Sequence, residues 1–406
     1  MNAALFFTLF ACWRPPDCPG LPDDLPSDWG TIPEGLDTDA FDEEVRSLMR
    51  AGCIPGLSAS VVDADGLILS AAWGWANLDE RIPVTVETPF MVASTSKAID
   101  AIALLLAEED GLLDREMSVS DAVGFPVRNE RLRGGETLRM KHLVTHSSGI
   151  QDNWDQVLDA SYAPGDPQEP LGEFLESYLT PDGEHFHRRG NFFPWPAGRE
   201  WMYSNVGAAL AAYAVEARSQ TPFDDYCEAR IFEPLGMTNS GWFLSDFADA
   251  DAVARPHVIT DGAWVVEEHY GFPTWPDGQL RSTPMDLGQV LRLALGDGAV
   301  DGERLLPAGA VRALSTEPVA GLDDWYLGDN MEAQYFLWFG MTLGDRWLIG
   351  HDGDDIGVTS EMFYDPQTGI GVSLLGNVTD WLTGATTREQ TLALQQRLYA
   401  IGEEAR

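Results

Sequence analysis

Apolar and polar positions near the start of the chain predict a helix followed by a β-hairpin. Between residues 37 and 50, apolar residues recur every three or four positions, which is the spacing of one helix face. The runs 56–62 and 67–72 are apolar and have the length of strands. Residues 63–66, Asp-Ala-Asp-Gly, separate these runs and are typical of a tight turn. The pattern therefore predicts two strands that pair with each other.

A longer apolar stretch comes next, and it has almost no polar face. It begins at Ser94 and ends at Asp110-Gly111, where a turn signal stops it. A helix that is apolar on nearly every side is typical of the buried core of a protein. We therefore expect this helix to lie at the centre of the fold.

The middle of the chain, about residues 111–278, is rich in loops and short helices. Apolar helices are predicted at 206–218 and 222–231. Residues 160–200 carry many proline, glycine and aromatic residues, which favours a lid or the wall of a cleft. This middle part is expected to be an insertion between two parts of one larger unit.

The last part of the chain returns to longer helices and strands. Helices are predicted at 286–295, 308–314 and 388–401, and strands at 335–341, 346–350, 358–364 and 369–375. Strands near both chain ends predict an α/β (α+β) fold, in which one antiparallel β-sheet, flanked by helices, is built from both ends around a mainly helical insertion. The predicted domain covers residues 35–406, with its α/β part at 35–110 and 279–406.

Residues 1–34 read as a signal and tether segment. An apolar run of about nine residues ends at Cys12 and is too short to span a bilayer. It is similar to a bacterial lipoprotein signal, which predicts export to the periplasm, the outer membrane or the medium, with membrane attachment through a lipid on Cys12. The alternative is an apolar start without a transport role. Residues 13–34 are rich in Pro, Asp and Gly and fit a tether.

Composition excludes several classes of partner. The chain has 406 residues, 44% of them hydrophobic, and a formal net charge of −40, which argues against nucleic acid, anionic membrane surfaces and polyanionic substrates. Its cysteines show no metal-ligand spacing. Among Cys18, Cys53 and Cys227, a disulfide and free buried thiols both remain open.

Ser94-x-x-Lys97 is the first candidate for chemistry. On a helix, residues three apart lie on one face, so the Ser94 hydroxyl and the Lys97 amine can meet. A serine hydroxyl needs a neighbouring base, and a buried lysine can lose its proton and become one. Lys97 and Lys141 are the only lysines among the 25 lysines and arginines. A lysine at position 97 is therefore notable, because lysine can lose its proton in a protein and arginine cannot. The competing interpretation is a helix cap with an unrelated lysine.

Two more motifs follow in order along the chain. Tyr203-Ser204-Asn205 offers a phenol and an amide just before an apolar helix, although such a motif is usually a helix cap. His351-Asp352-Gly353 is predicted to lie where a strand ends, and its glycine would let a substrate approach the backbone. A lone motif of this kind is usually a turn.

In this order, Ser-x-x-Lys, Tyr-x-Asn and His-x-Gly resemble the serine β-lactamase and penicillin-binding-protein superfamily, above all its branch of class C β-lactamases, D-alanyl-D-alanine carboxypeptidases and esterases. The resemblance implies a Ser94 nucleophile activated by Lys97. It implies that Tyr203 passes protons to the leaving group and that Asn205 binds Lys97 or substrate. No metal and no cofactor is implied. The remaining implied site residues are His351 in place of a lysine, Gly353, and Asp354, whose backbone N–H would complete an oxyanion hole with that of Ser94.

Several other histidines and aspartates are expected to affect the fold or the choice of substrate. His142 and His146 are expected to brace the fold, and His185-x-His187 to be surface loop histidines rather than a metal pair. Three aspartates surround the glycine of the last motif, where relatives bind a substrate carboxylate. Carboxylates there would repel such a group. The aspartates concerned are Asp352, Asp354 and Asp355.

The prediction is therefore a serine hydrolase with a small-molecule or peptide substrate, acting on neutral or amine-bearing esters or amides. A β-lactamase or D-Ala-D-Ala carboxypeptidase is one alternative. A non-catalytic penicillin-binding-like surface protein is another, against which the intact motif residues argue. The sequence specifies no oligomeric state.

Overall fold

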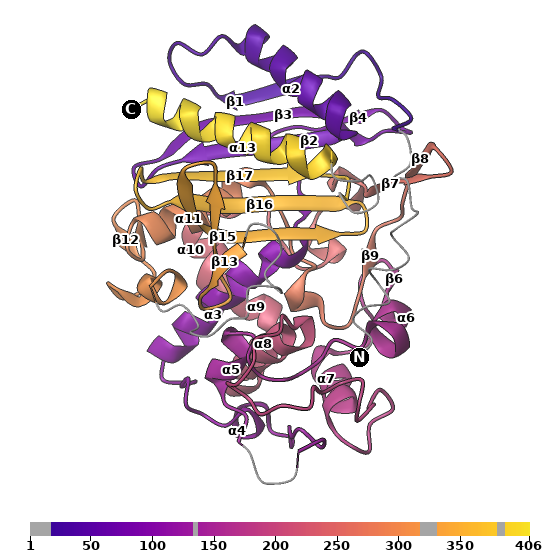
Figure 1. Cartoon of the computed structure of the whole chain (residues 1–406). Helices are drawn as coiled ribbons and strands as arrows, with labels where there is room; N and C mark the ends of the chain where they lie inside the picture. Colours follow the sequence, from indigo (N-terminus) through magenta and orange to yellow (C-terminus); the bar gives the residue numbers. More distant parts are fainter. Residues whose placement is uncertain (1–17, 133–136, 317–330, 380–385) are drawn as a thin grey trace.

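The computed structural model describes residues 18–132, 137–316, 331–379 and 386–406, and its centre is an antiparallel sheet (Figure 1). Within these residues the sheet has nine strands in the order β1-β3-β2-β17-β16-β15-β14-β13, with β4 paired to β3. The strands are β1 Ser27–Thr31, β2 Gly56–Val62, β3 Leu67–Asn77, β4 Ile82–Pro83, β13 Met331–Gln334, β14 Phe339–Leu343, β15 Arg346–Asp355, β16 Val358–Asp365 and β17 Ile370–Gly376. The two ends of the chain meet where β2 pairs with β17.

Helices cover both faces of the sheet. On one face, α2 (Thr38–Gly52) packs against α13 (Thr386–Glu404), and α13 lies on β2 and β17, as Figure 1 shows. On the other face, α11 (Pro284–Leu295) packs against β2, β16 and β17. Each layer buries its own apolar cluster against the sheet. This arrangement confirms the predicted fold class.

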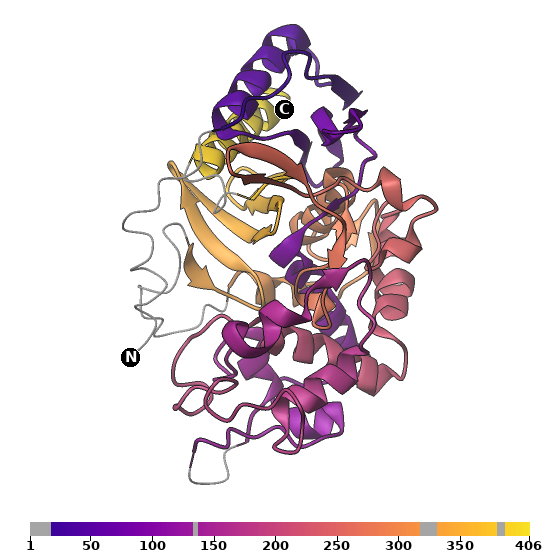
Figure 2. The ribbon, with the colours of Figure 1, turned by 90° about the vertical axis from the view of Figure 1, so that its right-hand side faces the viewer.

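The helical part lies at one side of the sheet, in the lower half of Figures 1 and 2. Its centre is α3 (Ser96–Glu109), which packs against α8 (Asn205–Ser219) and is buried from Ser96 to Ala107. Around them lie α4 Val119–Val123, α5 Met140–Val144, α6 Asp159–Ser161, α7 Leu171–Leu179, α9 Phe223–Cys227 and α10 Glu233–Leu235. The apolar stretch of the sequence is thus a central helix, as predicted.

Shorter elements connect these layers. The 3₁₀ turns are η2 Ala93–Thr95, η5 Leu244–Asp246, η6 Ala250–Ala252, η7 Trp275–Asp277 and η8 Ala310–Leu314, and the π-helical turns are η3 Trp154–Leu158 and η4 Glu228–Phe232. The small strand pairs are β5 Phe90–Met91 with β10 Arg281–Ser282, β6 Ala163–Pro164 with β9 Tyr270–Gly271, β7 His257–Thr260 with β8 Ala263–Val266, and β11 Ala299–Val300 with β12 Glu303–Arg304.

Several predicted elements were wrong in extent; the strand expected at 67–72, for example, continues to Asn77. The strand expected at 335–341 is a turn followed by β14, because Leu337 takes a left-handed φ of 56° and Tyr335 N–H bonds to Trp338 O. The helix expected at 308–314 is the 3₁₀ turn η8. The strand expected to end at Gly350 continues to Asp355, since β16 pairs with its polar residues too. The extension was not predicted because residues 351–355 are mostly polar and do not match an apolar strand pattern.

The structure pairs Cys18 with Cys53 in a disulfide and leaves Cys227 free and buried. Cys53 also ends α2, where it takes a left-handed φ of 54° and its N–H bonds to Met49 O. Across the described ranges, no helix is long and apolar enough to cross a membrane. Cys12 lies outside the described residues, so export and lipid attachment stay predictions.

Candidate active site

Ser94 and Lys97 lie next to each other at the start of the central helix. Ser94 belongs to the 3₁₀ turn η2 and Lys97 to the first turn of α3, so the pair was wrongly expected on one α-helix. The backbone nevertheless brings Lys97 Nζ within 3.1 Å of Ser94 Oγ. Ala93, just before the serine, takes a left-handed φ of 45° that costs energy in a residue with a side chain. This strained turn presents a partly exposed hydroxyl to the cavity.

Lys97 is completely buried, and its ammonium is held in place by acceptors. Besides Ser94 Oγ, it donates to Asn205 Oδ1 at 2.7 Å and to the backbone oxygen of Asp277 at 2.5 Å. Burial lowers the pKa of Lys97, but Tyr203, Asp277 and Asp100 outweigh this, and the pKa is raised overall. The expectation that burial alone would favour the neutral amine is therefore wrong.

Tyr203 packs directly on this pair. Lys97 Nζ lies 4.9 Å from the centre of the Tyr203 ring. The phenol oxygen is buried and has no hydrogen-bond partner among the residues described. Burial raises the pKa of Tyr203, while the nearby Lys97 and Ser94 lower it and offset part of this effect. The hydroxyl is thus a buried, unpaired group beside the serine.

Asp152 fixes the start of α8, which carries Asn205. Its carboxylate accepts from the backbone N–H groups of Asn205 at 2.7 Å and Val206 at 3.1 Å, and from Ser204 Oγ at 3.0 Å. Ser204 also accepts from Gly207 N–H and caps the helix. The Tyr-x-Asn motif is therefore a helix cap and a neighbour of Ser94 at once. Sequence reasoning missed Asp152.

His351 lies inside β15, not at its end as predicted. It pairs with Met362 of β16, and its ring centre lies 4.4 Å from that of Phe339 and 6.4 Å from that of Tyr203. Its Nδ1 donates to Asp352 O at 2.5 Å, so the proton sits on Nδ1 and Nε2 is bare. Burial lowers the pKa of His351 to about 4, which leaves the imidazole neutral at pH 7.

Gly353 has a packing role in addition to the one predicted from sequence. A Cβ there would lie 2.4 Å from Val92 O and 2.8 Å from Ser94 N, so the missing side chain lets β15 approach the backbone of Ser94. The next residue, Asp354, accepts from Thr379 Oγ1 at 2.5 Å. Among the described residues, β14 pairs with β15 only as far as Gly350. The 351–355 segment lies beyond this pairing with β14 and contacts η2.

A cavity of about 750 Å³ opens next to Ser94. It has an aromatic wall that includes Trp154 and Tyr162, and an acidic wall. None of the described residues that line it carries a positive charge. The acidic lining residues are Asp159, Asp277, Asp354 and Asp355. Asp352, in contrast, does not line the cavity as expected, because it points to α13 and pairs with Arg388 at 2.9 Å.

Two of these carboxyls have strongly shifted pKa values. Burial raises the pKa of Asp355 to about 6, although Ile356 N–H and the Tyr162 hydroxyl hydrogen-bond to it. Burial raises the pKa of Asp277 to about 7, against the opposing effect of Lys97. Oδ2 of Asp277 is buried and has no partner in the described part of the chain. Both groups therefore titrate near neutral pH.

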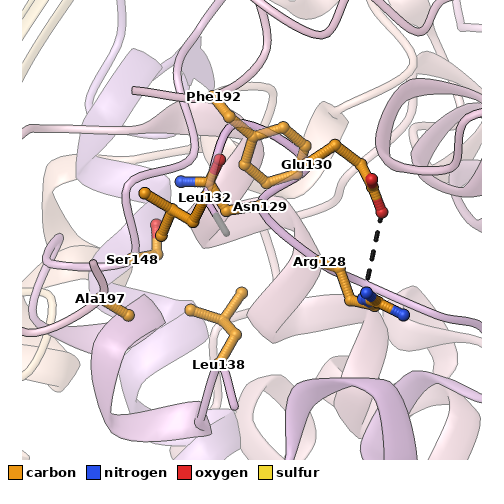
Figure 3. Close-up of a pocket in the computed structure, with 8 residues that line it drawn as sticks. All are labelled: Arg128, Asn129, Glu130, Leu132, Leu138, Ser148, Phe192 and Ala197. Carbon is orange, nitrogen blue, oxygen red and sulfur yellow. Dashed lines mark ion pairs between the residues drawn. The ribbon is translucent and has the colours of Figure 1, made fainter. Parts of the chain in front are cut away.

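A second cavity, shown in Figure 3, has no catalytic candidate. It measures about 60 Å³, enough for a few water molecules, and lies among Asn129, Leu138, Ser148 and Phe192. No group of His, Cys, Asp or Glu side chains in the described ranges is arranged to hold a metal ion. His185 instead faces Glu169 at 3.6 Å.

Comparison with known proteins identifies relatives along most of the chain. The family model described as Beta-lactamase matches residues 41–397. Penicillin-binding protein 4* of Bacillus subtilis is 30% identical over 193 residues, which cover 45% of this chain but only 37% of that protein. Penicillin-binding protein 4 of Amycolatopsis lactamdurans is 27% identical over 351 residues, covering 83% of this chain and 84% of the relative.

A solved structure has a similar fold. The D-amino acid amidase of Ochrobactrum anthropi SV3, in complex with L-phenylalanine amide, superposes with a TM-score of 0.70. The match covers 90% of this chain and 99% of the amidase at 21% sequence identity, a level at which the likeness concerns the fold.

Proposed function

Because the chain belongs to the Beta-lactamase family, whose members include serine hydrolases, we propose that it hydrolyses neutral or amine-bearing esters or amides through an acyl-enzyme at Ser94. The observation that carries this proposal is the 3.1 Å contact between Lys97 Nζ and Ser94 Oγ at the floor of an acidic cavity. The contact supplies the means of activating the serine. The cavity's charge selects the substrate.

In the proposed acylation, the Lys97–Tyr203 pair starts with one proton fewer than an ammonium and a phenol together, so it can accept one. Ser94 Oγ bonds to the substrate carbonyl carbon while its proton enters this pair. The two groups are coupled by charge, so they take up and release this proton as a unit. Tyr203 then gives a proton to the leaving oxygen or nitrogen as the bond to the carbonyl carbon breaks. Water then attacks the acyl carbon, its proton passes through the pair to Ser94 Oγ, and the acid is released. Asn205 keeps the Lys97 ammonium in position through the 2.7 Å bond.

The carbonyl oxygen becomes negative during both steps and needs hydrogen-bond donors. We assign this role to the backbone N–H groups of Ser94 and Asp354. The close approach of Gly353 to Ser94 N supports the assignment. A side chain at Gly353 would push the two donors apart.

The charge of the cavity supports a substrate without a negative group near the scissile bond. Asp277, Asp354 and Asp355 would attract an ammonium and repel a carboxylate. His351 cannot balance them, since its pKa of about 4 leaves it uncharged at neutral pH. The aromatic wall fits an apolar or aromatic group beside the amine. A D-amino acid amide, the class named for the amidase, has this combination.

A β-lactamase or D-Ala-D-Ala carboxypeptidase is the second candidate. The penicillin-binding names of both relatives favour it. Its substrates carry a carboxylate, for which the described lining residues offer no cation. This candidate therefore predicts much weaker turnover than the first.

Side-by-side hydrolysis assays distinguish the two. The substrates are an acetate ester, the p-nitroanilides of D- and L-phenylalanine with free amines, and a chromogenic cephalosporin, with Ser94→Ala as the blank. We expect kcat/KM at least ~10-fold higher for the ester or an amine-bearing anilide than for the cephalosporin. A clear preference for the cephalosporin would overturn the substrate assignment.

A further inference from the structure

His146 holds the backbone on both sides of Tyr203. Its own backbone oxygen accepts from Met202 N–H at 2.8 Å, and its Nδ1 accepts from Ser204 N–H at 3.2 Å. Met202 and Ser204 are the two neighbours of Tyr203 in the chain. One residue of a distant loop thus binds the backbone N–H groups of both neighbours of the tyrosine.

The imidazole also contacts the tyrosine directly. The ring centres of His146 and Tyr203 lie 4.4 Å apart, with an angle of 30° between their planes. His146 is 1% exposed and takes a left-handed φ of 49°, which a residue with a side chain adopts only when its surroundings enforce it. The backbone is therefore bent at the point where this contact is made.

The hydrogen bond from Ser204 fixes the protonation state of the ring. Nδ1 accepts, so it carries no proton, and the single proton of the neutral ring sits on Nε2. Nε2 is buried and has no partner within the described residues. Burial, followed by the positive charge of Lys97, lowers the pKa of His146 well below its usual value. A second proton on Nδ1 would oppose the Ser204 N–H and break the contact.

We propose that His146 is a positioning residue for Tyr203, and that its neutral imidazole, accepting from Ser204 and packing on the ring, sets the phenol beside Ser94. The inference rests on the proposed function, because it gives Tyr203 a proton to deliver. The sequence predicted that His146 only braces the fold. A positioning residue differs from this because losing His146 lowers activity only while Tyr203 is present.

A double-mutant cycle tests this dependence. The variants are His146→Leu, His146→Asn, Tyr203→Phe and their combinations, assayed on the best substrate found above. We expect His146→Leu to lower kcat ~100-fold with KM changed less than ~3-fold, the scale of losing a proton-transfer group. His146→Asn should keep kcat within ~10-fold of wild type, because asparagine tolerates the left-handed backbone and its carbonyl accepts from Ser204.

In the Tyr203→Phe background, His146→Leu should cost less than ~3-fold more, since the group it positions is already gone. An equal loss in both backgrounds would overturn the proposal and leave a bracing role. His142→Leu is the matched control. The side chain of His142 accepts from Arg139 N–H, three residues earlier in the chain. It should leave kcat within ~2-fold of wild type, and thermal midpoints verify folding of each variant.

Nitrogen NMR on the wild-type protein gives a result that does not depend on turnover or on the folding of a variant. With ¹⁵N-labelled histidine, we expect His146 Nδ1 to be unprotonated from pH 5 to 9 and to couple to the Ser204 amide nitrogen across the hydrogen bond. A protonated Nδ1 in this range would overturn the proposal. If no substrate is turned over but the coupling is present, the proposed function fails while the contact between His146 and Ser204 stands.

Discussion

Two buried polar groups on opposite sides of the Ser94 site, the Lys97 ammonium and the Asp277 carboxyl, differ in how completely they are paired. On the floor, the buried Lys97 ammonium has three acceptors within 3.1 Å. On the cavity wall, Asp277 keeps a buried carboxylate oxygen without a partner in the described part of the structure. Asp277 belongs to both sides, since its backbone oxygen binds Lys97 and its residue lines the cavity.

This difference indicates that the floor of the site carries out proton transfer, whereas the cavity wall selects the substrate. A buried ammonium with all its donors used is fixed in one position, as proton transfer requires. Burying a carboxyl without a partner is costly, and the cost falls when a ligand supplies a donor. The floor should therefore be intolerant of any change, whatever the substrate. Changes in the wall should matter mainly for substrates that carry an amine.

The largest effect is expected at Lys97. Lys97→Arg keeps a positive charge, but a guanidinium holds its proton more tightly than an ammonium, and its planar head does not fit the three acceptors. We predict a loss of at least ~10³-fold in kcat/KM for every substrate, on the scale of losing an activating base. Steady-state kinetics on ester and amine-bearing substrates measure it.

Lys141→Arg is the control for this change, because Lys141 is the other lysine of the chain. Its ammonium is exposed and pairs with Glu116 at 2.7 Å. Kinetics within ~2-fold of wild type are expected for a surface ion pair. If Lys97→Arg retained most of its activity, the floor would not be the activating centre.

A smaller and selective effect is expected at Asp355. Its pKa of about 6 means that the carboxyl is charged above pH 6 and becomes neutral as the pH falls through that value. In wild type, KM for an amine-bearing substrate should therefore rise as the pH falls from 7.5 to 5. Asp355→Asn should raise this KM ~10-fold at pH 7.5, the cost of one charged hydrogen bond, and weaken its pH dependence to the part that comes from Asp277, whose pKa is about 7.

A neutral ester measured in parallel should show little of either change. Asp352→Asn is the matched control, since this neighbour lies on the same strand but pairs with Arg388. It should leave KM for both substrates nearly unchanged. An equal rise in KM for the ester and the amine-bearing substrate after Asp355→Asn would contradict the assignment of the wall to selection for the amine.

Much of the floor could be predicted from sequence, because its residues sit in short motifs. Ser94 and Lys97 are three residues apart, and Tyr203 and Asn205 precede an apolar helix, so local patterns were enough to propose them. The structure brings the two motifs together through the 2.7 Å bond from Lys97 to Asn205.

The remaining features depend on contacts between distant segments. Asp152 is one of 65 acidic residues, and nothing in its neighbours marks it as the cap of a helix that begins some fifty positions later. The packing of Gly353 and the orientation of Asp352 were not predicted because strand β15 was expected to end at Gly350. Once β15 extends to Asp355, alternation along the strand places Asp352 and Asp355 on opposite faces of the sheet.

The most direct test of the central claim, that Ser94 is the acylated residue, is labelling with a fluorophosphonate probe followed by peptide mass spectrometry. The account predicts one adduct, on Ser94, in the wild-type protein, and none in Ser94→Ala. Labelling of wild type at another residue, or equal labelling of the Ser94→Ala variant, would contradict it. So would the absence of any adduct on a folded protein that hydrolyses the ester.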